Sequence, residues 1–266
     1  MTPLLAGLSE GHDFLAVHKP PGWLIHRSPL DPHETRIVLQ ALRDQLGQRV
    51  YPVHRLDKGT CGVLLVALNP DAARALGQAF ETHQVHKRYL AFVRGWPSMD
   101  EVLVDHALKP DDAPDDAAVQ PAQTRIRALA RFEIPESSDG RFSTTRVALV
   151  EAQPLTGRRH QIRRHLKHIA HPIIGDATHG KGPLNRWWAE RLGHQRLWLH
   201  AQALTFPHPV TGERTTVESG IQWTPGAMPA DGTLAVAEGL REHESARQWL
   251  ALWEYLRPYV AGSRTK

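Results

Sequence analysis

The stretch "HRLDKGTCGVLL", residues 54–65, joins a charged turn to the start of an apolar run. Asp57 is its only carboxylate and lies between two cations, Arg55 and Lys58. The uninterrupted apolar residues from Val63 to Ala67 are typical of a strand buried on both faces of a sheet. An acid among cations before a strand is usually a salt-bridged surface residue, so the role of Asp57 depends on the rest of the chain.

The apolar pattern of the whole chain predicts strands interspersed with helices. The expected strands cover residues 13–17, 63–67, 87–95, 124–134, 144–154, 197–206 and 214–219, and the expected helices cover 36–48, 69–80, a segment around Ile162 and Leu166, and 237–259. No series of strand–helix–strand units is present. The pattern therefore favours an α+β fold with a mixed, largely antiparallel sheet and flanking helices.

Composition restricts the class of protein. The 266 residues contain one cysteine, Cys61, which excludes an internal disulfide framework and fits a reducing compartment. The N-terminal "MTPLLAGLSEGHDF" lacks the basic start and long apolar core of a signal peptide, and the chain has no apolar window long enough to span a membrane. We therefore expect a cytoplasmic protein with no membrane contact.

Charge is unevenly distributed along the chain, although the formal net charge is only +4. The segment "RRHQIRRHLKH", residues 158–168, carries no acid, whereas "DDAPDD", residues 111–116, is purely acidic. Helical spacing would place Arg159, Arg163 and Lys167 in one row. Such a basic cluster indicates a polyanionic partner, nucleic acid being the commonest, with a solvated helix face as the alternative. The acidic segment is compatible with repelling RNA, mimicking it, or doing neither.

Several common chemistries find no support. Each histidine of the basic region, His160, His165, His168 and His171, is close to an Arg or Lys that would repel a metal dication. Neither phosphate-loop nor dinucleotide motifs occur. A hydrolase triad of His54 and Asp57 with Ser143 or Thr60 lacks a nucleophile elbow. We expect no metal and no cofactor.

Four further segments accompany the opening stretch. "HRLDKGTCG" resembles the HRLDxxTSG signature of the RluA family of pseudouridine synthases, with Cys61 where the signature usually has Ser. "KPPGWLIH", "KRYLAFVRG", "TGRRHQIRRHLKHIAHPIIGD" and "LHAQALTFPHP" resemble other motifs of that family, in the same order. Together they extend from Asp13 to about Ser219. Four segments are similar to the branch that modifies uridine 65 of tRNA: "PGWLIHRS", "HKRYLAFVRGW", "FSTTRVALVE" and "GDATHG" with its histidine.

The resemblance implies a fold and an activity. It implies the pseudouridine synthase fold, with a catalytic domain at 1–225 whose cleft binds RNA. No motif covers the chain beyond about residue 225, where the helical apolar pattern predicts an extension at 226–266 packed on that domain. The implied reaction isomerises a uridine of RNA to pseudouridine without a cofactor or an obligatory protein partner, the RNA being tRNA. A synthase acting on large-subunit ribosomal RNA is the alternative, and a non-catalytic RNA-binding or chaperone module is a weaker one.

The resemblance also implies roles for residues. Asp57 takes the place of the catalytic aspartate, which either attacks ribose C1′ or removes a 2′ proton. Tyr89 would stack on the base and provide a route for the C5 proton, and Arg163 would keep Asp57 ionised. Arg55 matches a residue that enters the space of the flipped base. Phosphate contacts are expected from the remaining basic residues, which are Arg158, Arg159, Arg164 and Lys167.

Cys61→Ser restores the usual residue of the signature. Both side chains are small and able to hydrogen-bond, so we expect the rate of pseudouridine formation to change by less than about threefold, well below the effect of losing a catalytic group. The rate of tritium release from uridine labelled at C5 measures this. A loss of tenfold or more would assign Cys61 a specific role.

Overall fold

The computed structural model describes residues 6–29, 31–111, 113–114, 116–224 and 232–261. Its strands are β1 (Ala6–Glu10), β2 (Phe14–Lys19), β3 (Tyr51–Pro52), β4 (Cys61–Ala67), β5 (His86–Arg94), β6 (Glu101–Asp105), β7 (Gln123–Ile134), β8 (Thr145–Pro154), β9 (Leu199–Pro207), β10 (Arg214–Glu218), β11 (Ile221–Thr224) and β12 (Thr233–Val236). Its α-helices are α1 (Val38–Leu46), α2 (Pro70–Glu81), α3 (Gln161–His168), α4 (Gly182–Leu192) and α5 (Glu244–Leu256).

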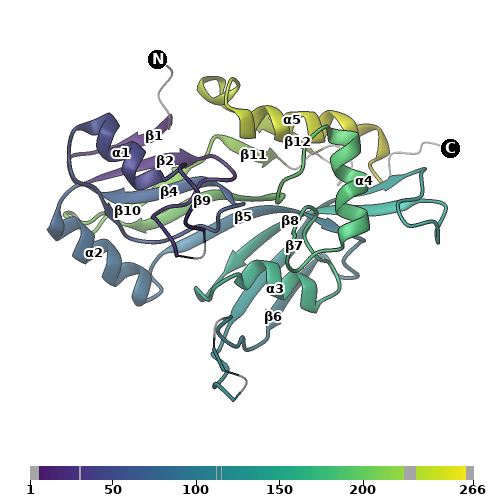
Figure 1. Ribbon diagram of the computed structural model, residues 1–266, viewed down its shortest axis with the longest axis horizontal. Coiled ribbons are helices and arrows are strands. Elements are labelled where there is room, and N and C mark those ends of the chain that lie inside the picture. The colour runs from purple at the N-terminus through teal and green to yellow at the C-terminus, as the bar shows by residue number, and fades with distance from the viewer. Residues whose placement is uncertain (1–5, 30, 112, 115, 225–231, 262–266) are drawn as a thin grey trace.

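A ten-stranded sheet organises the described part of the chain (Figure 1). Its strands follow the order β1-β2-β4-β9-β5-β8-β7-β6, with β3 beside β4 and β10 beside β9. Only β4 and β9 pair in parallel; the other pairs of this sheet are antiparallel, and β11 and β12 form a separate antiparallel pair. The predicted α+β class with a largely antiparallel sheet is confirmed.

The apolar run after Asp57 forms β4, an interior strand of this sheet between β2 and β9, and all seven of its residues are buried. Its alternate side chains face two different cores. Leu64 and Val66 belong to the core that contains α1, whereas Val63 and Leu65 belong to the core that contains α2. Figure 1 shows α1 and α2 on opposite sides of the strands in this half of the molecule. The strand is therefore apolar without interruption because both of its faces are covered.

Helix α2 begins as its sequence predicts. The Asn69 side chain accepts a hydrogen bond from the Ala72 backbone N–H at 2.8 Å, and Pro70 occupies the first helical position. Ala72, Leu76 and Ala79 are buried along one face. This helix covers the face of the sheet that carries Val63 and Leu65, and the turn after it leads into β5.

Helix α3 begins later than the even spacing of its basic residues suggests. His160 adopts a left-handed backbone conformation with φ of 54°, and the helix starts at Gln161. Arg159 therefore precedes the helix, Arg163 is buried on it and Lys167 is exposed. The expected row of Arg159, Arg163 and Lys167 along one helix is wrong, because the backbone turns at His160.

Other elements were not predicted, namely β1, β3, β6, β11, β12 and α4. The predicted helix at 237–259 is interrupted, because Glu238–Leu240 form a 3₁₀ turn before α5. The expected domain boundary between 225 and 226 falls at residues that the structure does not describe. Within the described ranges, no helix has the length and apolar character needed to cross a bilayer.

Gly62 allows β4 and β9 to approach each other at their parallel pairing. It has a φ of +109°, and a Cβ on it would lie 2.1 Å from the carbonyl oxygen of Ala201. Cys61 pairs with His200 and Gly62 with Ala201 in this register. A side chain at this position would therefore push apart two central strands beside the loop that carries Asp57.

Gly62→Ala should destabilise the protein by about 3 kcal/mol or more, because the added methyl overlaps a backbone oxygen and the backbone conformation is unfavourable for alanine. Urea unfolding measures the free energy of unfolding. Gly77→Ala is the matched control: a Cβ there meets nothing within 4 Å, and replacing a helical glycine should stabilise α2 by roughly 0.5–1 kcal/mol. Equal stability of the two variants would contradict the close approach at Gly62.

Candidate active site

Asp57 lies on the loop between β3 and β4, and a buried lysine holds this loop in place. Lys19 Nζ, at the end of β2, donates hydrogen bonds to the carbonyl oxygens of Pro20 at 3.0 Å, Lys58 at 3.1 Å and Thr60 at 2.7 Å. Burial lowers the pKa of Lys19 to about 7, whereas three acceptors match the three N–H bonds of the ammonium form and favour it. The lysine thus ties the residues that follow Asp57 to the end of β2.

Arg163 connects Asp57 to a second carboxylate. Its Nη1 donates to Asp57 Oδ2 at 3.0 Å, while Nε and Nη2 donate to the two oxygens of Asp176 at 2.7 and 2.8 Å. Asp57 and Arg163 are 106 positions apart in the sequence. The side chain of Asp176 has no exposed surface, and those of Arg163 and Asp57 are 10% and 19% exposed. The guanidinium thereby fixes the orientation of the Asp57 carboxylate relative to that of Asp176.

Asp176 belongs to this cluster, and the sequence analysis did not name it. Its Oδ1 also accepts hydrogen bonds from the backbone N–H groups of Thr178 at 3.0 Å and His179 at 2.9 Å. Burial alone would raise its pKa, but the hydrogen bonds from Arg163 and from these N–H groups lower it below the usual 3.8. Asp176 therefore remains a carboxylate that fixes the far side of the Arg163 guanidinium.

One signal could have identified Asp176: an acid directly after the apolar "HPIIG", where the chain is otherwise buried. The preceding Gly175 has a φ of +78°, and a Cβ there would lie 1.6 Å from the carbonyl oxygen of Arg196. The glycine lets the backbone bend against the segment that leads into β9. This bend brings the carboxylate back toward α3.

Asp57 and Arg163 separate two cavities. The larger, of about 720 Å³, extends over Val53, Tyr89, Ile162 and Leu199, and the other, of about 630 Å³, extends past His26, Lys58 and Gln195. Both are also lined by Arg55, Leu56, Asp57, Arg159, His160 and Arg163. The larger cavity offers an apolar wall beside a carboxylate, which suits a flat base whose sugar must reach an acid.

Tyr89 reaches this cavity from β5, with only 8% of its surface exposed. Burial and the negative charge of Asp57 raise the pKa of the phenol, so it is neutral at ordinary pH. Lys87, two residues earlier, lines the same cavity and donates to the carbonyl oxygen of Thr156 at 3.1 Å. Burial lowers the pKa of Lys87. The sequence analysis names Tyr89 among the expected site residues but does not name Lys87.

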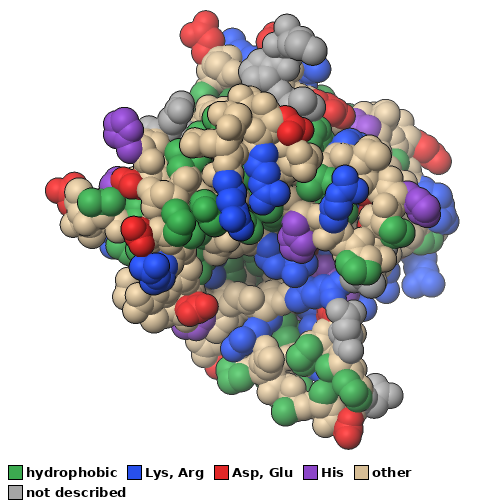
Figure 2. All heavy atoms as spheres, turned by 60° about the vertical axis from the view of Figure 1, so that its left-hand side comes forward, with side chains coloured by type: hydrophobic (Ala, Val, Ile, Leu, Met, Phe, Trp, Pro, Cys, Tyr) green, Lys and Arg blue, Asp and Glu red, His purple; other side chains and the backbone are tan. Residues whose placement is uncertain are grey.

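The structure places the five expected RNA-binding residues in different surroundings. Arg55 and Arg159 line both cavities, and Arg158 lines the larger one. Arg164 lies away from Asp57, donating to the carbonyl oxygen of Lys109 at 2.6 Å and to Asp111 at 3.1 Å. Lys167 is exposed and lines neither cavity. On the face drawn in Figure 2, Lys and Arg side chains gather beside a hollow.

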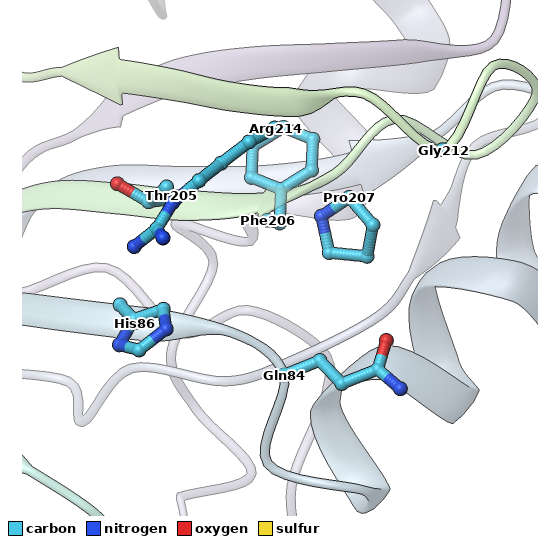
Figure 3. Close-up of a pocket in the computed structure, with 7 residues that line it drawn as sticks. All are labelled: Gln84, His86, Thr205, Phe206, Pro207, Gly212 and Arg214. Atoms are coloured by element: carbon cyan, nitrogen blue, oxygen red, sulfur yellow. The ribbon is translucent and has the colours of Figure 1, made fainter.

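A separate groove of about 210 Å³ lies between the start of β5 and the β9–β10 hairpin (Figure 3). Gln84, His86, Phe206 and Arg214 are among the residues that line it. It shares no lining residue with either cavity at Asp57. The groove is therefore not part of the candidate active site.

Asp176→Asn should lower the free energy of unfolding by about 3 kcal/mol at neutral pH, because it leaves the buried Arg163 with one carboxylate. The folded-state pKa of Asp176 is depressed, so the stabilisation by this carboxylate is complete above about pH 4 and is lost as the pH falls through the lower folded-state value. Urea unfolding of both proteins between pH 7 and pH 3 measures the difference. A difference that grows toward acid would contradict an ionised Asp176.

Comparison with known proteins agrees with this geometry. A model of the RNA pseudouridylate synthase family matches residues 13–168. The proteins named tRNA pseudouridine synthase C of Salmonella typhimurium and Vibrio cholerae are 48% and 47% identical to the chain, over 79% and 78% of it and 83% and 87% of their own lengths. The corresponding protein of Yersinia pestis is 48% identical over 80% of the chain and 85% of its own length.

Solved structures show the same fold. Human RNA pseudouridylate synthase domain containing 1 superposes with a TM-score of 0.65 and 25% identity, covering 92% of this chain and 95% of that one. Human RNA pseudouridylate synthase domain containing 4 superposes with a TM-score of 0.60 and 26% identity, covering 80% and 87%. The chain therefore belongs to the RNA pseudouridylate synthase family and is an enzyme of the isomerase class.

Proposed function

We propose that this enzyme converts one uridine of tRNA, uridine 65, to pseudouridine, with Asp57 as its catalytic carboxylate. The observation that carries the proposal is the Asp57 carboxylate, hydrogen-bonded by Arg163 at 3.0 Å on the boundary of two cavities. The choice of tRNA is supported by the names of relatives that are 47–48% identical over most of the chain. The choice of position 65 follows from the resemblance of four sequence segments to the branch that modifies it.

The reaction needs an acid and no redox partner. The bond between ribose C1′ and uracil N1 breaks, the base rotates, and C5 bonds to C1′. The C5 proton is lost and N1 gains a proton, so the product is an isomer of the substrate and no electrons are exchanged with another molecule. The residues at the site have therefore to supply a carboxylate, an orientation for the base and a path for protons.

Arg163 determines how Asp57 acts. Whether Asp57 attacks C1′ or removes the 2′ proton, the reactive form is the anion. Burial disfavours an anion, and a hydrogen-bonded guanidinium compensates for that cost. Asp176 holds the other edge of the guanidinium with bonds of 2.7 and 2.8 Å, so it acts on the reaction through Arg163 and is a positioning residue.

The larger cavity is the proposed site of the base. Tyr89 presents its ring beside Ile162 and Leu199 on this wall, and stacking on an aromatic ring holds a base without reading its sequence. The phenol is neutral because burial raises its pKa. Tyr89 is therefore proposed to stack on the uracil and to relay the C5 proton as a hydroxyl group rather than as a phenolate.

A uridine in a stem has to leave the helix before Asp57 can reach its sugar, at a cost of a few kcal/mol. Phosphate contacts contribute to offsetting this cost. Arg158 and Arg159, at the edge of the larger cavity, are proposed to supply them near the reacting nucleotide, and Arg164 and Lys167 to supply them farther along α3. Arg55 is exposed and lines both cavities, where it is proposed to fill the space that the base leaves.

Three further assignments belong to the same proposal. The enzyme acts in the cytoplasm, as the single cysteine suggests. Residues 1–225 form the catalytic domain and 226–266 an extension packed on it. The described part of that extension contacts the body of the protein, since Trp249 of α5 packs edge-to-face on Trp198 with ring centroids 5.2 Å apart.

The test is tritium release from a tRNA transcript labelled at C5 of its uridines. We expect the wild-type protein to release tritium equivalent to one uridine, and Asp57→Asn to reduce the rate by at least about 10³-fold, as loss of a catalytic carboxylate should. The Asn side chain has the size of Asp, so RNA binding in a filter assay should persist. Unchanged release by Asp57→Asn would remove the proposed mechanism.

The position is tested with a transcript in which cytidine replaces uridine 65. This change should abolish release, while replacement of another stem uridine should not. Release from large-subunit ribosomal RNA and not from tRNA would replace the proposed substrate with the ribosomal one. Binding of RNA without release from either would indicate a non-catalytic module.

A further inference from the structure

The carboxylate of Asp111 lies among three basic side chains at the start of α3. Its Oδ2 is 2.7 Å from His160 Nδ1 and 3.5 Å from Arg159 Nε, and its Oδ1 accepts a hydrogen bond from Arg164 Nη1 at 3.1 Å. The Asp111 side chain is 21% exposed. Both of its oxygens therefore face basic groups of one short segment, although Asp111 lies about fifty positions earlier in the chain.

These basic groups lie beside the catalytic cavity. His160 Nε2 is 3.9 Å from Asp57 Oδ1, and Arg159 lines the same two cavities as Asp57. On the other side, Arg159 and Arg164 line a neighbouring hollow of about 400 Å³ together with Asp111 itself. His160 thus lies between the carboxylates of Asp57 and Asp111, and Asp111 contacts basic side chains that are proposed to bind the RNA backbone.

The arrangement around Asp111 has the chemistry of a phosphate site. Arginine side chains bind the paired oxygens of carboxylates and of phosphates in the same way, and an RNA phosphate carries one negative charge like a carboxylate. While Asp111 is in place, two arginines that would hold a phosphate already have an anion. A phosphate arriving at Arg159 and Arg164 has to compete with this carboxylate.

We propose that Asp111 is an internal substitute for an RNA phosphate, which occupies Arg159, His160 and Arg164 in the free enzyme and is displaced by the substrate backbone. The inference rests on the proposed RNA substrate. Every RNA that uses the site has to displace the same carboxylate, so RNAs that make few other contacts bind too weakly to stay. The acidic residue thereby limits non-specific binding beside the active site.

The experiment compares Asp111→Asn with Asp116→Asn in the full-length protein. Both remove one negative charge from the same acidic segment without changing side-chain size, but Asp116 is exposed and forms no ion pair with a described residue. The Kd for unlabelled tRNA transcript is measured at several KCl concentrations. Thermal unfolding shows whether each variant is folded, and Arg164 retains its hydrogen bond to the Lys109 carbonyl oxygen in both.

Asp111→Asn should tighten tRNA binding by about five- to tenfold at moderate salt. Arg159 and Arg164 no longer face the Asp111 carboxylate in this variant, so they gain a phosphate contact without displacing it. The slope of log Kd against log salt should steepen by about 0.7 to 0.9, the value of one additional phosphate contact. Asp116→Asn should change Kd by less than about twofold, since a distant exposed charge is screened. A structural role for Asp111 would not steepen the salt slope.

Two results would overturn the inference. Equal Kd values and salt slopes for the two variants would mean that Asp111 does not compete with RNA. A slower single-turnover release by Asp111→Asn with unchanged Kd would mean that Asp111 serves only to hold His160 near Asp57. Failure of the proposed function is recognised separately, as absence of tritium release by the wild-type enzyme, and the comparison of Kd values needs no turnover.

Discussion

The guanidinium of Arg163 is shared between two carboxylates, and the active site depends on this sharing. Asp57 comes from the loop before β4, Arg163 from α3 and Asp176 from the bend after it, so one side chain joins three segments. A buried ion pair gains little for stability by itself, because desolvation offsets the attraction. Its value here lies in orientation, because the guanidinium holds both carboxylates in fixed positions, and only the removal of Arg163 would leave both of them without this partner.

The sheet provides the rigidity that this arrangement requires. Lys19 ties the Asp57 loop to the end of β2 through the carbonyl oxygens of Lys58 and Thr60, and Gly62 lets β4 lie close against β9. Behind the loop, Arg196 donates to Cys61 Sγ at 2.8 Å and to Gln248 of α5 at 2.6 Å. Arg196 thus links the C-terminal helix α5 to Cys61, the first residue of β4. The strand that follows the Asp57 loop is therefore held by this arginine as well as by its pairing with β2 and β9.

Patterns in the sequence predicted those structural features that depend on residues close together in the chain. The buried run of β4 and the Asn69 cap of α2 follow from side chains near one another in the chain. The roles expected for Asp57, Tyr89 and Arg163 came from motif resemblance rather than from physical reasoning, and they stay predictions. Asp176 and the late start of α3 at His160 were missed, because a carboxylate that meets its arginine through a bend and a left-handed residue leave no periodic signal. Short edge elements such as β1 and β6 were missed for a related reason: strand pairing defines them more than composition does.

The hydrogen bond from Arg163 also makes the two oxygens of Asp57 inequivalent. Oδ2 accepts a hydrogen bond from the guanidinium at 3.0 Å, whereas Oδ1 lies 3.9 Å from His160 Nε2. A free carboxylate in water has no preferred reactive atom, but this one has a direction. For an acid that acts at C1′, a fixed direction means that one side of the ribose ring faces the enzyme and the other faces the base. The handedness of the product would then be set by a contact that already exists before any RNA has bound.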